Sequence, residues 1–174
     1  MSSEEAFAQL YQDTRGPLWA YIYRCVGNPG DADDIAQEAY LRFLRAAAAP
    51  RDPTGARRYV FTIASNLVRD RWRSAERHQS WLTRWLTTTP RVAPPFVEPS
   101  ARLAREASLA GIFNRLGPRD RALLWLAHVE QLGHAEIGEI LNLRPGSVKV
   151  MVHRARARLR DLMQGDSQGS SRDA

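Results

Sequence analysis

A cluster of prolines near the middle of the chain restricts the possible folds more than any other feature. Four prolines lie within ten residues, at positions 90, 94, 95 and 99. Because proline has no backbone N–H to donate, neither a helix nor an inner strand can run through this stretch. We therefore predict a linker at residues 78–100, flexible and extended in places. It would divide the 174 residues into two small domains.

Apolar side chains recur every three or four residues on both sides of this linker, which is the spacing of helices. No run of residues alternates between apolar and polar as a half-buried strand does. The prediction is an all-α fold with two small helical domains joined by a flexible linker. The domains are expected at residues 1–77 and 101–163, followed by a mobile, Gly/Ser-rich tail at residues 164–174.

Three helices are expected in the first domain. The first covers about residues 4–27, with a break near Gly16-Pro17. The second begins at Asp31 and runs to about Pro50, and the third covers about residues 56–77. The apolar sides of the second and third helices are expected to consist of Ile35, Tyr40, Leu41 and Leu44, and of Tyr59, Val60, Ile63, Ala64 and Leu67.

Residues 131–160 have the pattern of a helix-turn-helix. Asn142-Leu143 is a short turn, and Pro145 suits the first turn of the next helix, where its missing N–H is not needed. Such a second helix presents its first turns to base edges in the major groove of DNA. A purely structural helical hairpin with a basic exterior is the alternative. The expected core residues are Ala135, Ile137, Ile140 and Leu141 in the first helix, and Val148, Val152, Ala155, Leu159 and Leu162 in the second.

Positive charge is concentrated in two short segments. The chain has a net charge of +6, and Lys149 is its single lysine beside 24 arginines. Residues 1–53 contain five basic and eight acidic side chains, whereas residues 54–77 contain six and two, and residues 144–160 contain six and none. Two basic stripes are expected of a protein that binds the phosphates of nucleic acid. Taken alone, the charge is equally consistent with solvated helix faces.

Several classes of protein are disfavoured. No apolar run approaches the ~20 residues that span a bilayer, and Glu4 and Glu5 lie where a signal peptide would carry basic residues. A cytoplasmic protein without membrane insertion is therefore expected. Cys25 is the only cysteine, which excludes an internal disulfide, and we expect it to be buried as a small apolar residue. The four histidines are scattered, so no metal site is predicted.

Three blocks of sequence resemble one family. Residues 31–42 read Asp-Ala-Asp-Asp-Ile-Ala-Gln-Glu-Ala-Tyr-Leu-Arg, and residues 59–73 read Tyr-Val-Phe-Thr-Ile-Ala-Ser-Asn-Leu-Val-Arg-Asp-Arg-Trp-Arg. Both resemble the second conserved region of bacterial RNA polymerase sigma factors. Residues 133–159, with Ser-Val-Lys-Val-Met-Val-His-Arg-Ala-Arg in the second helix, resemble the fourth. The region that larger sigma factors carry between these two is absent, as in the extracytoplasmic-function group.

The resemblance implies a promoter-recognition subunit that has no catalytic residue and no cofactor of its own. Its implied partners are core RNA polymerase, promoter DNA and an anti-sigma factor, and its regulon would respond to stress or another signal. The implied polymerase contacts are Asp33, Asp34, Gln37, Glu38 and Leu41. The implied minus-ten contacts are Arg57, Arg58, Asn66, Arg69, Arg71 and Arg73, with the loop 50–56 as the pocket for a flipped base. The implied minus-thirty-five contacts are Arg144, Ser147, Lys149, Val150, His153, Arg154 and Arg156.

Three departures from the family's pattern bear on these roles. Val150-Met151 replaces the usual Ser-Arg, which exchanges a hydrogen-bonding reader for an apolar contact. The loop at residues 47–56, with two prolines after a run of alanines, differs from the usual Phe-Arg-Gly-Asp form. Gly138 replaces an alanine, which is expected to loosen the first helix of the helix-turn-helix by about 1 kcal/mol.

Two other functional classes are consistent with parts of the sequence. A helix-turn-helix repressor or activator with an N-terminal helical sensory domain explains the second domain but leaves the block 31–42 and Asn66 without a role. A nucleic-acid-processing enzyme would need a metal site. The acidic residues at 31–34 lie close together at one helix start, with no second cluster to complete such a site.

Overall fold

The computed structural model describes residues 3–82 and 110–169. Residues 110–115 are helical, and the described residues contain no strand, so the all-α prediction is confirmed. Most of the predicted linker and the predicted start of the second domain lie outside the described residues. The labelled helices are α1 (Ser3–Val26), α2 (Pro29–Arg45), α3 (Pro53–Leu82), α5 (Pro118–His128), α6 (His134–Leu141) and α7 (Pro145–Gly169).

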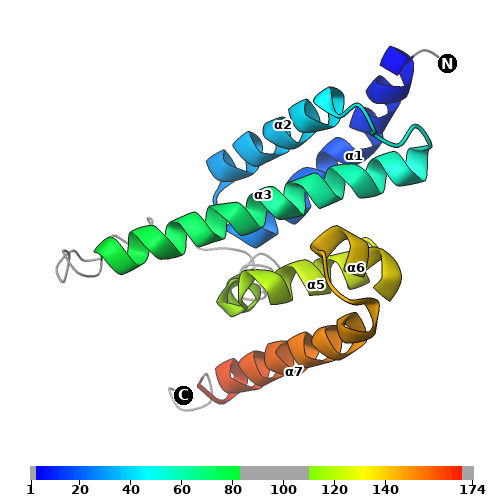
Figure 1. The fold of residues 1–174 in the computed structure, drawn as a ribbon. Coiled ribbons are helices and arrows are strands. Elements are labelled where there is room, and N and C mark those ends of the chain that lie inside the picture. Colours follow the sequence, from blue (N-terminus) through cyan, green and yellow to red (C-terminus); the bar gives the residue numbers. More distant parts are fainter. Residues whose placement is uncertain (1–2, 83–109, 170–174) are drawn as a thin grey trace, which may run out of the picture.

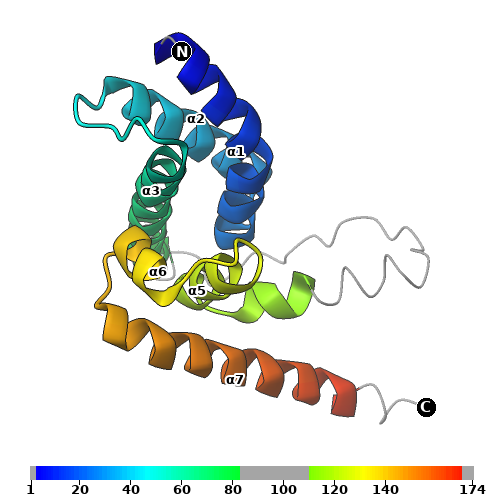
Figure 2. The same cartoon turned by 90° about the vertical axis from the view of Figure 1, so that its right-hand side faces the viewer.

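The helices form three layers, seen from two sides in Figure 1 and Figure 2. The bundle of α1, α2 and α3 is one layer, the short helices α5 and α6 lie against it, and α7 lies on their far side. One core cluster joins Leu18 and Phe61 of the first domain to Leu126 and Ile137 of the second. The two domains therefore pack directly against each other, and α7 faces away from the first domain.

The break expected in the first helix is absent, because α1 continues through Pro17. Gly16 and Pro17 lie on the exposed side of α1, where water can hydrogen-bond the carbonyl that proline leaves without a partner. Leu18, Tyr21 and Ile22 are fully buried on the other side. Each large apolar side chain contributes about 1.5–3 kcal/mol on burial. Together they outweigh the roughly 3 kcal/mol that proline costs inside a helix.

The ends of α2 differ from the prediction. The helix begins at Pro29 instead of Asp31, and it ends at Arg45 instead of near residue 50. Asn28 caps the start, since its Oδ1 accepts the Asp31 N–H at 3.0 Å. Proline in the first turn of a helix needs no hydrogen-bond partner for its nitrogen, so α2 can begin at Pro29, two residues before the predicted start.

Two leucines of α2 that were predicted to be core residues are exposed. Ile35 and Tyr40 are buried as expected, but Leu41 and Leu44 are 36% and 56% exposed. The Tyr40 hydroxyl is 2.7 Å from the Thr14 hydroxyl of α1. Because α2 lies at the edge of the bundle, only one of its sides has neighbours to pack against (Figure 1).

Helices α3 and α7 extend beyond their predicted ends. α3 runs from Pro53 to Leu82, where residues 56–77 were expected. Asp52 supports the early start, because its Oδ1 accepts the Gly55 N–H at 2.7 Å. α7 continues to Gly169, so residues 164–169 of the predicted mobile tail are helical. Neither stretch contains a further proline that would end the helix.

The corner between α6 and α7 confirms the helix-turn-helix. Asn142 has φ 52° and ψ 52°, a left-handed conformation that asparagine tolerates. The predicted core residues Ile137, Ile140, Val148 and Val152 are buried. Ala135 is exposed, contrary to the prediction. Ala135 lies two positions before the buried Ile137. Residues two apart are rotated by about 200° around a helix, so Ala135 lies on nearly the opposite side.

Gly138 is required at this corner, which corrects the expectation that it merely loosens α6. A Cβ at this position would lie 2.9 Å from the backbone oxygen of Leu143 and 3.5 Å from the Cα of Pro145. The Leu143 N–H also donates to the Gly138 carbonyl at 2.8 Å. The chain leading into α7 therefore approaches α6 too closely for any side chain here.

Candidate polymerase and DNA interfaces

The residues expected to contact polymerase lie on an accessible side of α2. Asp34, Gln37 and Leu41 are exposed, and their spacing of three and four places them on one side of the helix. Glu38 lies beside them and pairs with Arg42, with 2.7 Å between Oε1 and Nε. The result is an acidic surface with an exposed leucine, which suits a partner that combines basic and apolar groups.

Asp33 differs from Asp34 and Glu38 because its hydrogen bond comes from another helix. The Trp19 Nε1–H of α1 donates to its Oδ1 at 2.6 Å. The Trp19 ring in turn stacks on Tyr23, with 5.1 Å between the ring centroids. Asp33 therefore helps to fix α2 against α1, which is a structural role beside the predicted one.

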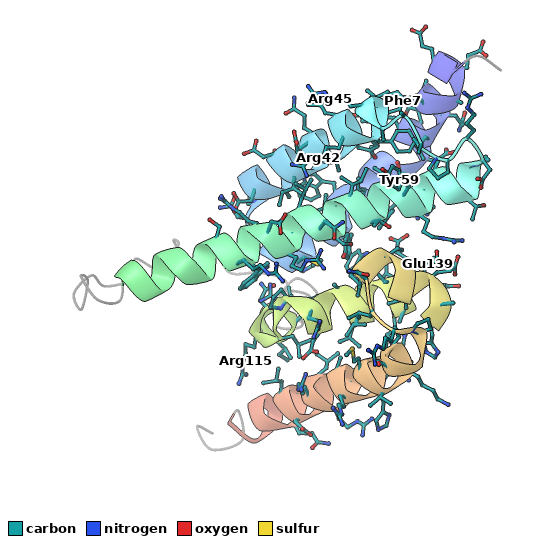
Figure 3. The ribbon with its side chains drawn as sticks, in the orientation of Figure 1. Phe7, Arg42, Arg45, Tyr59, Arg115 and Glu139 are labelled. Atoms are coloured by element: carbon teal, nitrogen blue, oxygen red, sulfur yellow. The ribbon has the colours of Figure 1, made fainter. Side chains whose placement is uncertain are left out.

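The arginines at the start of α3 are paired with carboxylates of the second domain. Arg57 donates from Nη2 to Glu130 Oε2. Arg58 donates from Nη1 to Glu139 Oε2 at 2.8 Å and from Nη2 to Glu136 Oε1 at 3.3 Å. Figure 3 shows Glu139 on α6, beneath the first turns of α3. Two of the predicted minus-ten arginines are thus occupied by the second domain.

The predicted minus-ten residues further along α3 interact within the first domain. Arg69 donates from Nη2 to Asn66 Oδ1, and Arg71 pairs with Asp31 of α2. Both arginines are exposed, and so is Arg73. From residue 57 to residue 73 these five arginines, which we call the arginine row, are spread over about 24 Å of helix at 1.5 Å per residue. Because residues two apart lie on nearly opposite sides of a helix, Arg69 and Arg73 share one side and Arg71 lies on the other.

A groove of about 650 Å³ lies between the start of α1, the end of α2 and the loop at residues 46–52. Phe7 and Phe43 line it, with ring centroids 6.2 Å apart and ring planes inclined by 29°. Pro50 and Arg57 line its other side. Residues 50–56, predicted as a loop that accepts a flipped base, thus border a cavity, although residues 53–56 belong to α3. Aromatic rings beside an arginine suit a stacked base and its phosphate.

The exposed side of α7 carries the residues expected to read the minus-thirty-five duplex. Lys149, His153 and Arg154 are exposed, and Val150 is 49% exposed. The side chains of Lys149, His153 and Arg154 form no hydrogen bond or ion pair with any residue that the structure describes. Ser147 lies in the first turn, where its N–H donates to the carbonyl of the exposed Arg144 at 2.9 Å. Since α7 is the outer layer, this side is open to a duplex (Figure 2).

Two other arginines of α7 contact α5. Arg156 donates from Nε to His128 Nε2 at 2.9 Å, and Arg158 pairs with Asp120 at 2.6 Å. Desolvation, and next the charge of Arg156, lower the pKa of His128. The neutral imidazole accepts the hydrogen bond, so the predicted DNA contact Arg156 is oriented by α5.

A buried arginine of α5 was not predicted as a functional residue. Arg121 is 6% exposed, and its Nη1 lies 3.3 Å from the carbonyl oxygens of Arg24 and Cys25 at the end of α1. Its guanidinium lies 5.7 Å from the centre of the Trp72 ring of α3. Carbonyls at a helix C-terminus lack partners and attract a cation. The two carbonyls are nearly a hundred residues away in sequence, so no local pattern could have revealed this contact.

Cys25 and the acidic and histidine residues suggest no further site. Cys25 is fully buried as predicted, and burial raises its pKa to about 12. No group of three or more His, Cys, Asp or Glu within residues 3–82 and 110–169 could hold a metal ion. Among the same residues, no helix has the length and apolar character to cross a membrane.

Two family descriptions match the chain. Residues 10–78 match Sigma-70 region 2, and residues 107–159 match Sigma-70, region 4. The first match contains the acidic surface of α2 and the arginine row of α3. The second contains the helix-turn-helix through Leu159.

Two curated relatives match this chain over about nine tenths of their own length. The ECF RNA polymerase sigma factor SigW of Bacillus subtilis (strain 168) is 30% identical over an aligned length of 174. This alignment covers 92% of this chain and 90% of SigW. The RNA polymerase sigma factor CarQ of Myxococcus xanthus is 28% identical over 162 residues, with coverage of 92% and 91%.

Solved structures share the fold. The sigma factor RpoE of Bartonella quintana, crystallised with the anti-sigma factor NepR, has a TM-score of 0.67 at 17% identity, covering 91% of this chain and 96% of RpoE. CnrH, solved with the cytosolic domain of CnrY, has a TM-score of 0.65 at 24% identity, covering 95% and 92%. At these identities the likeness shows the fold alone.

Proposed function

The chain belongs to the extracytoplasmic-function group of sigma-70 RNA polymerase sigma factors, and on that premise we propose how its surfaces divide the work of promoter recognition. The acidic side of α2 binds core polymerase. The arginine row of α3 and the neighbouring groove hold the minus-ten strand. The first turns of α7 read the minus-thirty-five duplex. The observation that carries this proposal is that the two matched regions coincide with the two domains that bear these surfaces.

The minus-ten assignment rests on how unpaired bases are held. A base leaves the stack and enters a pocket, while basic side chains follow the backbone of its strand. The groove beside Phe7 and Phe43 has the rings for stacking, and Arg69 and Arg73 lie exposed on the side of α3 that carries Asn66. Asn66 lies between them and the groove along the helix, where its amide can hydrogen-bond a base edge.

The minus-thirty-five assignment rests on the accessible side of α7. Arg154 and Lys149 can donate to the O6 and N7 of guanine, and Val150 can contact a thymine methyl group. Arginines later on the helix contact phosphates, which supply affinity without sequence preference. Arg156, already oriented by His128, belongs to this second group.

Polymerase performs the chemistry in this proposal, so the chain acts as a binding subunit in the cytoplasm and not as an enzyme. RpoE was crystallised with an anti-sigma factor, and a partner of that class would keep this chain inactive until a signal arrives. A helix-turn-helix repressor would account for α6 and α7, but it would leave the acidic side of α2 unused.

Run-off transcription with core polymerase on genomic promoters tests the proposal. Adding the chain should produce discrete promoter-dependent transcripts, whereas the free chain should bind duplex DNA weakly. Asn66→Ala should reduce permanganate reactivity of unpaired thymines while the closed complex still forms. A tight, sequence-specific footprint by the free chain without any transcript would instead support a repressor.

A further inference from the structure

Five charged residues form a cluster between the two domains, which we call the interdomain ion cluster. Arg57 and Arg58 come from the start of α3, and Glu130, Glu136 and Glu139 come from the segment that contains α6. Opposite charges thus face each other across the domain boundary. Within the described residues, these are the ion pairs that join α3 to the second domain.

The cluster is partly shielded from water. The Glu130 side chain is 6% exposed, and it also accepts the Trp125 Nε1–H at 3.3 Å. The Arg57 guanidinium lies 5.2 Å from the centre of the Phe61 ring. Ion pairs are stronger where water is excluded than they are on an open surface. Removing Arg57 while the domains stay packed would leave the buried Glu130 carboxylate without its ion-pair partner, which is costly.

A carboxylate and a phosphate bind a guanidinium in the same way, through charge-assisted hydrogen bonds from its N–H groups. Arg58 gives one Nη to Glu139 and the other to Glu136. Each Nη keeps a second N–H, but a phosphate that approached it would meet the negative charges of both carboxylates. The acidic residues of the second domain thus oppose the binding of a DNA strand to these arginines.

While the two domains are packed against each other, the protein cannot contact both promoter elements at once. Elements at minus ten and minus thirty-five lie about 25 base pairs apart, or roughly 85 Å at 3.4 Å per pair. The 30-residue α3, the longest helix described, extends only about 45 Å. α3 and α7 lie in one compact body (Figures 1 and 2). The domains must separate before α3 and α7 reach their elements together.

We propose that Glu130, Glu136 and Glu139 compete with promoter DNA for Arg57 and Arg58, and so hold the free protein in a closed, self-inhibited state. This inference rests on the proposed role of the arginine row in binding the minus-ten strand. One feature of the cluster favours release. Among the described residues, Arg58 Nε is buried without a hydrogen-bond partner. The closed state therefore leaves one donor unpaired, a cost that opening removes.

The test uses the full chain with Glu130→Gln and Glu139→Gln together. Glu136 stays unchanged, because its Oε2 accepts the Gly133 N–H at 3.0 Å at the start of α6. The matched control is Glu4→Gln with Asp161→Asn, which removes two exposed carboxylates outside the cluster and changes the net charge equally. Both variants should show the helical circular dichroism of the parent chain.

Domain separation is measured by energy transfer between dyes on Gln12→Cys in α1 and Gln164→Cys in α7, two exposed sites. Cys25 is fully buried and should not react with the dyes. The cluster variant should lower the transfer, and the control should not. Affinity for a single-stranded minus-ten oligonucleotide is measured in parallel. If nine molecules in ten are closed, opening tightens the apparent affinity about tenfold.

A charge swap gives an independent test if the double variant folds poorly. Glu139→Arg should open the domains by placing like charges together, and adding Arg58→Glu should close them again. Unchanged transfer in every cluster variant, or equal opening in the control, would overturn the proposal. Opening without tighter oligonucleotide binding would also overturn it. That last result would show that Arg57 and Arg58 do not bind the strand. The sigma function itself is tested separately, by run-off transcription with the unmodified chain.

Discussion

Helices α3 and α7 carry the two basic segments of the chain, yet their charges have different surroundings. On α3, Arg57, Arg58 and Arg71 pair with carboxylates from other helices or from the segment before α6. On α7, Lys149 and Arg154 have no such partner among the residues that the structure describes. Two helices that both carry basic segments therefore differ in how accessible their basic side chains are to DNA.

The layers of the fold explain the difference. α3 lies against α6, whose carboxylates face its first turns, whereas the outer side of α7 has no neighbour (Figure 2). A helix proposed to bind duplex DNA can stay exposed, because binding through phosphates alone lacks sequence preference and has dissociation constants of about 10⁻⁴–10⁻⁶ M at physiological salt. A helix meant for a melted strand is needed only after polymerase has opened the promoter. Lys149 and Arg154 of α7 are therefore accessible, whereas Arg57 and Arg58 of α3 are engaged by carboxylates of the second domain.

The largest effect is expected from changing the acidic surface of α2, which is proposed to bind core polymerase and so to bring both helices to the promoter. Asp34→Ala, Gln37→Ala and Glu38→Ala together should abolish co-purification with core polymerase and reduce run-off transcription to background. These side chains lie at or near the surface, so circular dichroism should not change. A matched control with Glu4→Ala, Gln12→Ala and Asp161→Ala should transcribe normally. Normal transcription by the α2 variant would show that polymerase binds elsewhere.

A substitution at the corner between α6 and α7 should destabilise the helix-turn-helix and leave α3 unaffected. Gly138→Ala should lower the free energy of unfolding by about 3 kcal/mol, because its Cβ would press on the backbone oxygen of Leu143. Gly165→Ala is the control, since nothing lies within 4 Å of its Cβ. That change should stabilise the helix by up to about 1 kcal/mol. Urea unfolding measures both, and equal effects would contradict the close approach seen at Gly138.

Within α7, base reading and phosphate binding should separate along the helix. Arg154→Ala should reduce discrimination at one or two upstream base pairs by about 1–3 kcal/mol. Arg160→Ala, two turns further on, should weaken binding to all sequences alike and reduce the salt slope by about one. Holoenzyme affinities for promoter variants at several salt concentrations measure both effects. A change of sequence preference with Arg160→Ala would contradict this order.

The smallest effect should come from the pH dependence of the contact between α5 and α7. The folded pKa of His128 is lowered, so the unfolded chain binds its proton more readily. The stability from this group is therefore complete above its ordinary pKa of about 6.5 and is lost as the pH falls through the folded value. Protonation also releases Arg156, because imidazolium cannot accept a hydrogen bond. An NMR titration of His128 with stability measured in parallel checks this, and His128→Gln should remove the dependence. A folded pKa above 6.5 would contradict it.

Much of the fold could be predicted because its causes are local. Apolar spacing predicted the helices, the proline cluster predicted the division into domains, and Asn142 and Pro145 predicted the helix-turn-helix corner. Errors arose where distant residues intervened. The packing of Leu18 and Tyr21 keeps α1 straight through Pro17. Leu41 is exposed because α2 has no neighbour on that side.

The candidate binding surfaces could likewise be predicted from the sequence only in part. Which residues carry charge, and on which helix, can be read along the chain, because composition and periodicity are properties of neighbouring residues. Which charges remain available depends on distances in space. Arg58 meets Glu139 across 81 positions of sequence, and Arg121 meets the end of α1 across 97. Only the packing of the two domains brings these groups within the few ångströms at which a guanidinium and an oxygen atom bind.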